Sequence, residues 1–132
     1  MDKIKQLFLL ALSTLTLYSA AAVYEKTVFA EWDKPSINVF YVLPQEVNDQ
    51  TEILFIIHGN SRNADGYIEV WANHAKDKNI ILIAPEFSRS KFSNYNTLQM
   101  SSSTGKILKN RDLYLNNSID IMFNHYKNLF GV

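Results

Sequence analysis

The sequence predicts a single α/β domain in which helices cover parallel strands, and two observations favour this fold class. Residues 53–57 and 80–84 form unbroken apolar runs, the pattern of strands buried on both faces in the middle of a parallel sheet. Between these runs, apolar residues recur at helical spacing. Because parallel strands need a crossover connection, the order strand, helix, strand predicts a parallel pair joined by a helix.

A hairpin is expected before this unit. Residues 24–32 are rich in aromatic and β-branched side chains, turn-forming residues follow at 33–36, and residues 37–43 are again apolar. Pro44 is expected to end the second strand. The domain therefore begins with two antiparallel strands.

The remaining elements follow in order. The crossover helix is expected to begin near Asn63 or Asp65 and to end before Asn79, and Pro85 is expected to stop the second apolar strand. Residues 85–111 are rich in Ser and Asn and too long for a passive connection, which makes them a candidate functional loop. A last helix is predicted over residues 112–130.

Two groups of apolar residues complete the predicted core. The last helix carries one apolar stripe, formed by Leu115, Ile119, Met122, Tyr126 and Leu129. Tyr67, Trp71 and Tyr126 are expected in the core rather than in an aromatic binding surface.

Composition excludes several classes of protein. The chain of 132 residues is 47% hydrophobic and 20% charged, which is typical of one modest globular domain. Lys and Arg together number 13, as do Asp and Glu, so no net charge attracts a polyanion. We therefore expect no nucleic-acid partner.

Residues 1–22 have the pattern of a secretory signal peptide. Lys3 and Lys5 precede an apolar run over residues 7–23, whose end is rich in small residues that export peptidases cleave. Cleavage would leave a periplasmic or secreted domain of residues 23–132; the alternative is a membrane anchor formed by residues 7–23. The chain has no cysteine, which excludes a lipid-anchored lipoprotein and a disulfide scaffold.

His58, Gly59 and Asn60 follow the first apolar strand directly. At the carboxyl end of a parallel strand, a glycine lets the backbone turn sharply, and the next N–H groups can face the crevice where ligands of open α/β sheets bind. The simpler interpretation is a turn glycine beside a hydrogen-bonded histidine, with no function beyond the fold.

Three strings resemble exported α/β-hydrolases of the esterase and polyester-depolymerase type: "ILFIIHGNSRNADGYIEVW", "NIILIAPEFSRSKFSNYN" and "NNSIDIMFNHY". The resemblance covers residues 24–132 and implies a partial α/β-hydrolase fold, with an N-terminal hairpin, parallel strands and crossover helices. It implies that the backbone N–H of Asn60 belongs to an oxyanion hole and that His58 and Gly59 support this loop. The residues it places near the mouth of the site are Arg62, Glu86, Phe87, Ser88 and Tyr95.

The sequence departs from this family in one important respect. None of its four glycines, Gly59, Gly66, Gly105 and Gly131, belongs to a nucleophile elbow G-x-S-x-G. The acid and the histidine of the triad follow the elbow in chain order, so we expect a chain truncated before the elbow and inactive alone. Such a chain leaves an open apolar edge along the strand at residues 53–57, which predicts self-association.

Other chemistry has less support. "SSSTGK" at residues 101–106 lacks the first glycine and the final Ser or Thr of a phosphate-binding loop, and no histidine spacing suits a metal. We expect no cofactor and no metal. The favoured hypothesis is a fragment of an ester or peptide hydrolase that would act, if completed, on an ester-like small molecule or polymer. The alternatives are a small exported ligand-binding protein and a membrane-tethered interaction module.

Overall fold

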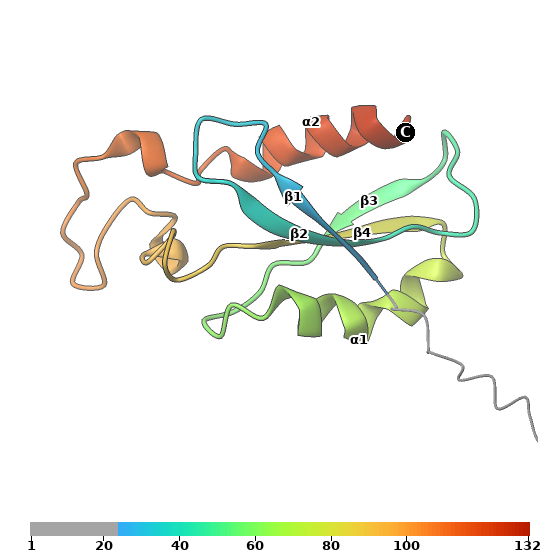
Figure 1. Cartoon of the computed structure of the whole chain (residues 1–132), viewed down its shortest axis with the longest axis horizontal. Helices are drawn as coiled ribbons and strands as arrows, with labels where there is room; N and C mark the ends of the chain where they lie inside the picture. The colour runs from blue at the N-terminus through green and yellow to red at the C-terminus, as the bar shows by residue number, and fades with distance from the viewer. Residues whose placement is uncertain (1–23) are drawn as a thin grey trace, which may run out of the picture.

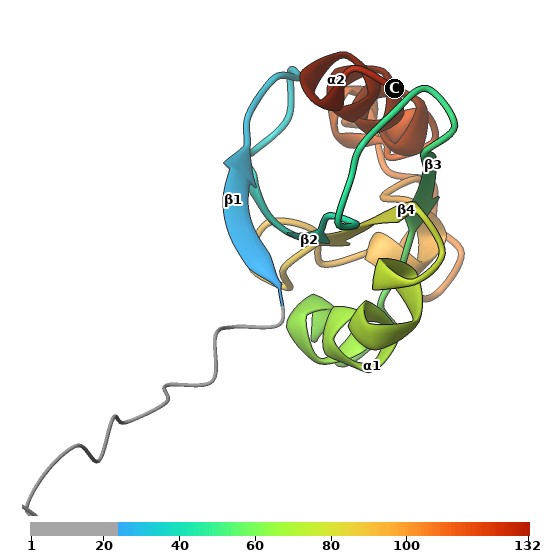
Figure 2. The same ribbon diagram turned by 90° about the vertical axis from the view of Figure 1, so that its right-hand side faces the viewer.

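A computed structural model describes residues 24–132 as a four-stranded mixed sheet between two helices (Figures 1 and 2). The predicted signal peptide, residues 1–22, and the alternative anchor, residues 7–23, lie outside the described residues. The elements are β1 (Glu25–Phe29), β2 (Ile37–Val42), β3 (Glu52–Phe55), α1 (Ala64–Lys76), β4 (Ile80–Glu86), two 3-10 turns (Tyr95–Thr97 and Arg111–Leu113) and α2 (Ser118–Phe130). Among residues 24–132, no helix is long and apolar enough to cross a bilayer.

The strands lie in the order β1-β2-β4-β3. β1 and β2 pair antiparallel, which confirms the predicted hairpin, and β3 and β4 pair parallel, which confirms the predicted crossover through α1. β2 also pairs antiparallel with β4. This order makes β4 a central strand and β3 an edge strand.

The two helices cover opposite faces of the sheet, with α1 on one side and α2 on the other (Figure 2). Alternate residues of β4 divide between them, because successive side chains of a strand point to opposite faces. Ile81 and Ile83 join the core under α2, with Met122 and Tyr126, while Leu82 joins the core under α1. Each helix therefore buries its own apolar layer.

The prediction that both apolar runs are buried on both faces is correct for β4 and wrong for β3. β3 has β4 on one side and no described strand on the other, so Leu54 is 41% exposed and Ile57 is 44% exposed. The apolar edge expected beside residues 53–57 is therefore present in the described part of the chain.

Pro85 does not stop β4, contrary to the prediction. β4 continues to Glu86, and Pro85 pairs with Val39 in the register with β2. Ile83 faces β3, since its C=O accepts a hydrogen bond from the Ile56 N–H. Pro85, two residues later, faces the same side, beyond the last pairing with β3, so its missing N–H costs no ladder bond.

Several predicted core residues lie elsewhere. Leu115 is buried but precedes α2, whereas Ile119 and Leu129 are exposed, so the buried face of the helix is narrower than the predicted stripe. Tyr126 is buried as expected. Tyr67 and Trp71 are wrong as core residues, because they are 39% and 49% exposed.

Candidate functional site

A four-residue turn follows β3 at the predicted position. The Gly59 C=O accepts a hydrogen bond from the Arg62 N–H at 3.2 Å, with Asn60 and Ser61 between them. Arg62 has a φ of 62°, whereas Gly59 is not in the left-handed region. The sharp backbone conformation predicted for the glycine therefore falls on Arg62, where a side chain makes it less favourable.

His58 joins this turn to the segment after β4. Its ring is buried, and its Nε2 accepts a hydrogen bond from the Phe87 N–H at 3.0 Å. Because Nε2 is the acceptor, Nδ1 carries the proton and donates to the Gly59 C=O at 2.9 Å. Burial lowers the pKa of His58 below its usual value, which favours this neutral form. His58 therefore links the Gly59 C=O to the Phe87 N–H, and its support of an oxyanion loop stays a prediction.

Arg62 holds the same segment from a second side. Its Nη1 donates to the Phe87 C=O at 2.6 Å and to the Phe92 C=O at 3.1 Å. The guanidinium lies over the Tyr95 ring, 4.5 Å from the centroid, and the Tyr95 hydroxyl donates to the His58 C=O at 3.0 Å. Arg62 is only 7% exposed, so it acts as an internal clamp rather than as a residue open to a substrate.

Asn60 lies exposed at the tip of the turn. Its C=O accepts a hydrogen bond from Nη2 of Arg89 at 2.6 Å. Within residues 24–132, its N–H has no protein acceptor. An exposed backbone donor without a protein partner, fixed on a braced turn, is suited to bind an oxygen that gains negative charge.

The other predicted mouth residues divide into two groups. Phe87 and Tyr95 stack on each other beside His58, with ring centroids 5.1 Å apart. Glu86 instead faces the hairpin, where its carboxylate accepts a hydrogen bond from Nδ2 of Asn38 at 2.7 Å, and Ser88 lines the same small hollow. The structure therefore does not bring Glu86 and Ser88 to the turn.

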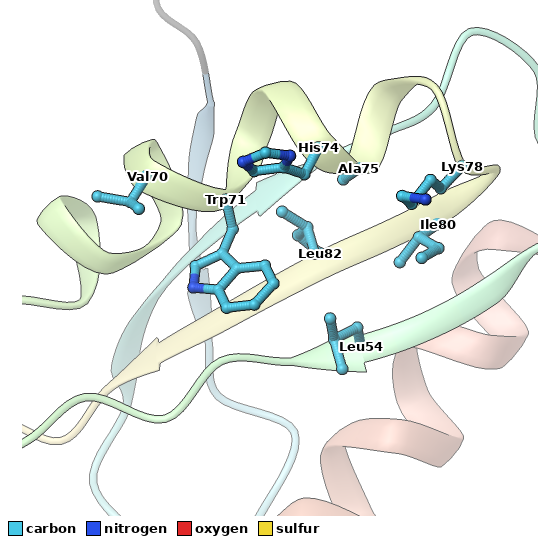
Figure 3. A pocket seen from close by; sticks show the side chains of 8 residues that line it. All are labelled: Leu54, Val70, Trp71, His74, Ala75, Lys78, Ile80 and Leu82. Atoms are coloured by element: carbon cyan, nitrogen blue, oxygen red, sulfur yellow. The ribbon is translucent and has the colours of Figure 1, made fainter.

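A hollow of about 350 Å³ lies beside the turn. It is bounded by Ile57 at the end of β3, by Phe87 and Tyr95, and by Ser118 and Ile119 at the start of α2. The hydroxyl of Ser118 is buried and has no hydrogen-bond partner in the described chain. A larger hollow of about 440 Å³ lies away from the turn, between α1 and β3 (Figure 3).

Sequence reasoning missed Arg89 and Phe92, which bond to residues of the turn, and Ser118, which lines the smaller hollow. All three residues lie there because of tertiary contacts, which the sequence does not show. Only Ser118 had a local signal in the sequence, its position at the start of an amphipathic segment. No group of three or more metal-ligating side chains occurs in the part of the chain that the structure describes.

The mixed sheet, the helix on each face and the turn after β3 define a partial fold of the α/β-hydrolase type. The chain is similar to poly(aspartic acid) hydrolase-1 from Sphingomonas sp. KT-1, with 31% identity, a TM-score of 0.70, and coverage of 82% of this chain and 42% of that one. It is also similar to LpqC, a poly(3-hydroxybutyrate) depolymerase from Bordetella parapertussis, with 16% identity, a TM-score of 0.65, and coverage of 80% and 37%.

The second likeness shows the fold alone. The chain spans less than half the length of either protein. No protein-family model matches the sequence. A search of curated proteins finds no match either.

Proposed function

We propose that the chain is the part of an exported hydrolase that carries the oxyanion-hole loop. The complete enzyme would cleave ester or peptide bonds in an ester-like small molecule or a polymer. The observation that carries this proposal is the exposed Asn60 N–H, without a protein acceptor in the described chain, on a turn braced by His58 and Arg62. In acyl transfer, such a donor stabilises the negative charge that develops on the carbonyl oxygen. Asn60 is then the catalytic donor, and His58 and Gly59 support it.

The nucleophile, the acid and the catalytic histidine come from outside these 132 residues in this proposal, and the chain is inactive alone. His74 lines the hollow between α1 and β3, His125 packs against Phe29, and both ring nitrogens of His58 bond to backbone groups. The chain would therefore contribute binding and electrostatic stabilisation only. Similarity to poly(aspartic acid) hydrolase-1 supports a polymer as the completed enzyme's substrate.

The proposal is tested by completing the fold. The chain would be fused to the part of poly(aspartic acid) hydrolase-1 that the match leaves uncovered, and hydrolysis of poly(aspartic acid) and of a chromogenic ester would be measured. We expect activity from the fusion and none from either part alone. An inactive, folded fusion would count against the proposal, as would hydrolysis by the chain alone.

Two further parts of the proposal have simple tests. Reading the DNA beyond the codon for Val132 in three frames should reveal an apolar strand and G-x-S-x-G, followed by Asp and His; their absence would favour the exported binding protein.

Export predicts that the mature protein begins near Val23. Recovery of intact Met1 in a membrane fraction would instead favour the tethered module.

A further inference from the structure

Tyr67 lies beside the Asn60 turn, although it belongs to α1. It is the fourth residue of that helix, and helical side chains lean towards the N-terminus of their helix, so its ring extends back towards the turn. A Cβ atom placed on Gly59 would lie 3.4 Å from the Tyr67 hydroxyl oxygen. Within residues 24–132, no other heavy atom beyond the chain neighbours of Gly59 lies within 4 Å of that position. The hydroxyl therefore borders an open space beside Gly59.

The hydroxyl of Tyr67 is free to bond to a substrate. The hydroxyls of Tyr41, Tyr95 and Tyr114 each donate to a protein acceptor, whereas that of Tyr67 has no partner in the described chain. Burial raises the pKa of Tyr95, and the nearby phenol of Tyr67 adds to this effect. Tyr67 therefore lies close to the residues that brace the turn but takes no part in bracing it.

The Asn60 N–H lies on the same side of its peptide as the Gly59 Cα. In a trans peptide, the N–H of one residue and the Cα of the residue before it share one side of the C–N bond, and the C=O lies on the other. The described residues include no cis peptide, and the Gly59 C=O faces the His58 ring. Two donors without protein acceptors in the described chain, the Asn60 N–H and the Tyr67 hydroxyl, therefore lie next to the Gly59 Cα.

We infer that the Tyr67 hydroxyl is a second donor to the oxyanion, beside the Asn60 N–H. This inference rests on the proposed hydrolase function. A phenol O–H is a hydrogen-bond donor, and tyrosine side chains can supplement backbone N–H groups in an oxyanion hole. Tyr67 donates to the negative oxygen without losing its proton, so no bond of the phenol is broken. Its exposure, which the fold does not require, then leaves it open to the reacting carbonyl.

The test uses the fusion described above and the hydrolysis of the chromogenic ester. Tyr67→Phe removes only the hydroxyl and should lower kcat about 10²-fold with little change in KM, because the oxygen carries its charge in the transition state. Tyr24→Phe is the matched control. It removes the hydroxyl of a tyrosine that packs on Phe40, and it should leave kcat unchanged.

A trifluoromethyl ketone separates a catalytic donor from a structural role. The nucleophile adds to the ketone carbon, and the former carbonyl oxygen becomes an oxyanion. Tyr67→Phe should therefore weaken this inhibitor by about the same factor as it lowers kcat. Urea denaturation should show Tyr67→Phe as stable as the parent fusion, since the hydroxyl has no protein partner to lose.

The outcomes distinguish this inference from the proposed function. Equal kcat values for Tyr67→Phe and an active parent fusion overturn the inference and leave the role of Asn60 intact. A raised KM with unchanged kcat also overturns it, because the hydroxyl would then bind substrate and transition state equally. A folded but inactive parent fusion overturns the proposed function, and the inference with it.

Discussion

His58 and Arg62 illustrate how two side chains fix a turn that has few backbone hydrogen bonds of its own. Between them they bond to the backbone of Gly59, Phe87 and Phe92. Hydrogen bonds from a charged donor are stronger than those between neutral groups, so the clamp formed by Arg62 is the stronger contribution. Both residues act on the position of Asn60 without contacting its N–H.

His58 makes the stability of the domain depend on pH. Burial lowers its folded-state pKa below the unfolded value of about 6.5, so the unfolded chain binds a proton first as the pH falls. The contribution of the neutral ring is therefore complete above that value and is lost progressively below it. We expect the free energy of unfolding to fall between about pH 7 and pH 5.

Chemical denaturation across this pH range checks the prediction. His58→Gln keeps a donor and an acceptor but does not titrate, so its stability should vary less with pH than that of the wild type. His74→Gln, at an exposed helix position, serves as the control. Equal pH dependence in the wild type and in His58→Gln would refute the role assigned to this ring.

Arg62→Lys tests the clamp. An ammonium group cannot reproduce the planar donor that bonds to two carbonyls and stacks on Tyr95, so we expect a loss of about 1–3 kcal/mol in the free energy of unfolding. Arg89→Lys, at an exposed arginine, should change it by less than about 0.5 kcal/mol. Urea denaturation measures both, and equal effects of the two substitutions would contradict the clamp.

At the residue scale, the sequence indicated a turn after the first apolar strand, and the support by His58 stays a prediction. The sequence also placed Glu86 and Ser88 at this turn, whereas the structure has them beside the hairpin. A glycine after a strand is a local signal, whereas the φ of 62° at Arg62 is imposed by the buried contacts of its own side chain. The resemblance placed both Glu86 and Phe87 near the mouth of the site, but adjacent residues at the end of a strand point to opposite faces. The resemblance alone could not separate them.

β3 is the element that governs the expected self-association of the chain. Its outer edge has no described strand, and exposed apolar side chains flank it on both faces of the sheet. These are Leu54, Val70 and Trp71 on the side of α1, and Ile57, Ile119 and Phe123 near α2. An edge of this kind pairs with another strand unless a charge or a covering segment prevents it.

We expect the chain to self-associate through this edge, which sedimentation velocity can detect. Leu54→Lys places a charge on β3 and should shift the distribution towards the monomer. Val28→Lys places the same charge on the opposite edge of the sheet, where Val28 is 59% exposed, and should have little effect. A monodisperse wild-type monomer, or equal effects of both substitutions, would contradict this prediction.

At the element scale, the apolar runs and their spacing were sufficient to predict the hairpin, the crossover pair and both helices, although the last helix begins at Ser118 and not at residue 112 as predicted. The length of β4 could not be predicted in this way, because the strand can contain Pro85 only where β3 no longer pairs with it. The exposure of Tyr67 and Trp71 could not be predicted from helical spacing either. Periodicity identifies an apolar face, but it does not show whether another element covers that face.

At the scale of the whole molecule, the sheet places the Asn60 turn and the adjacent hollow at one end, and the open β3 edge runs beside both. The fold class was predictable because strand order follows from a few topological rules. The contacts of residues 85–111 were not predictable from the sequence, because they include hydrogen bonds to distant residues, such as that from Lys91 to Ser36.

The central claim is that the Asn60 N–H stabilises the oxyanion, and one measurement tests it most directly. In the completed fusion, Asn60→Pro removes this N–H, while Asn60→Ala keeps it and removes only the side chain. Proline suits the second position of the turn that Gly59 begins, so the fold should persist.

We predict that Asn60→Pro lowers kcat about 10²-fold to 10³-fold relative to Asn60→Ala, with little change in KM. Circular dichroism and urea denaturation would confirm that both variants are equally folded. Equal kcat values in two folded variants would contradict the account, because the backbone donor would then make no contribution to the transition state.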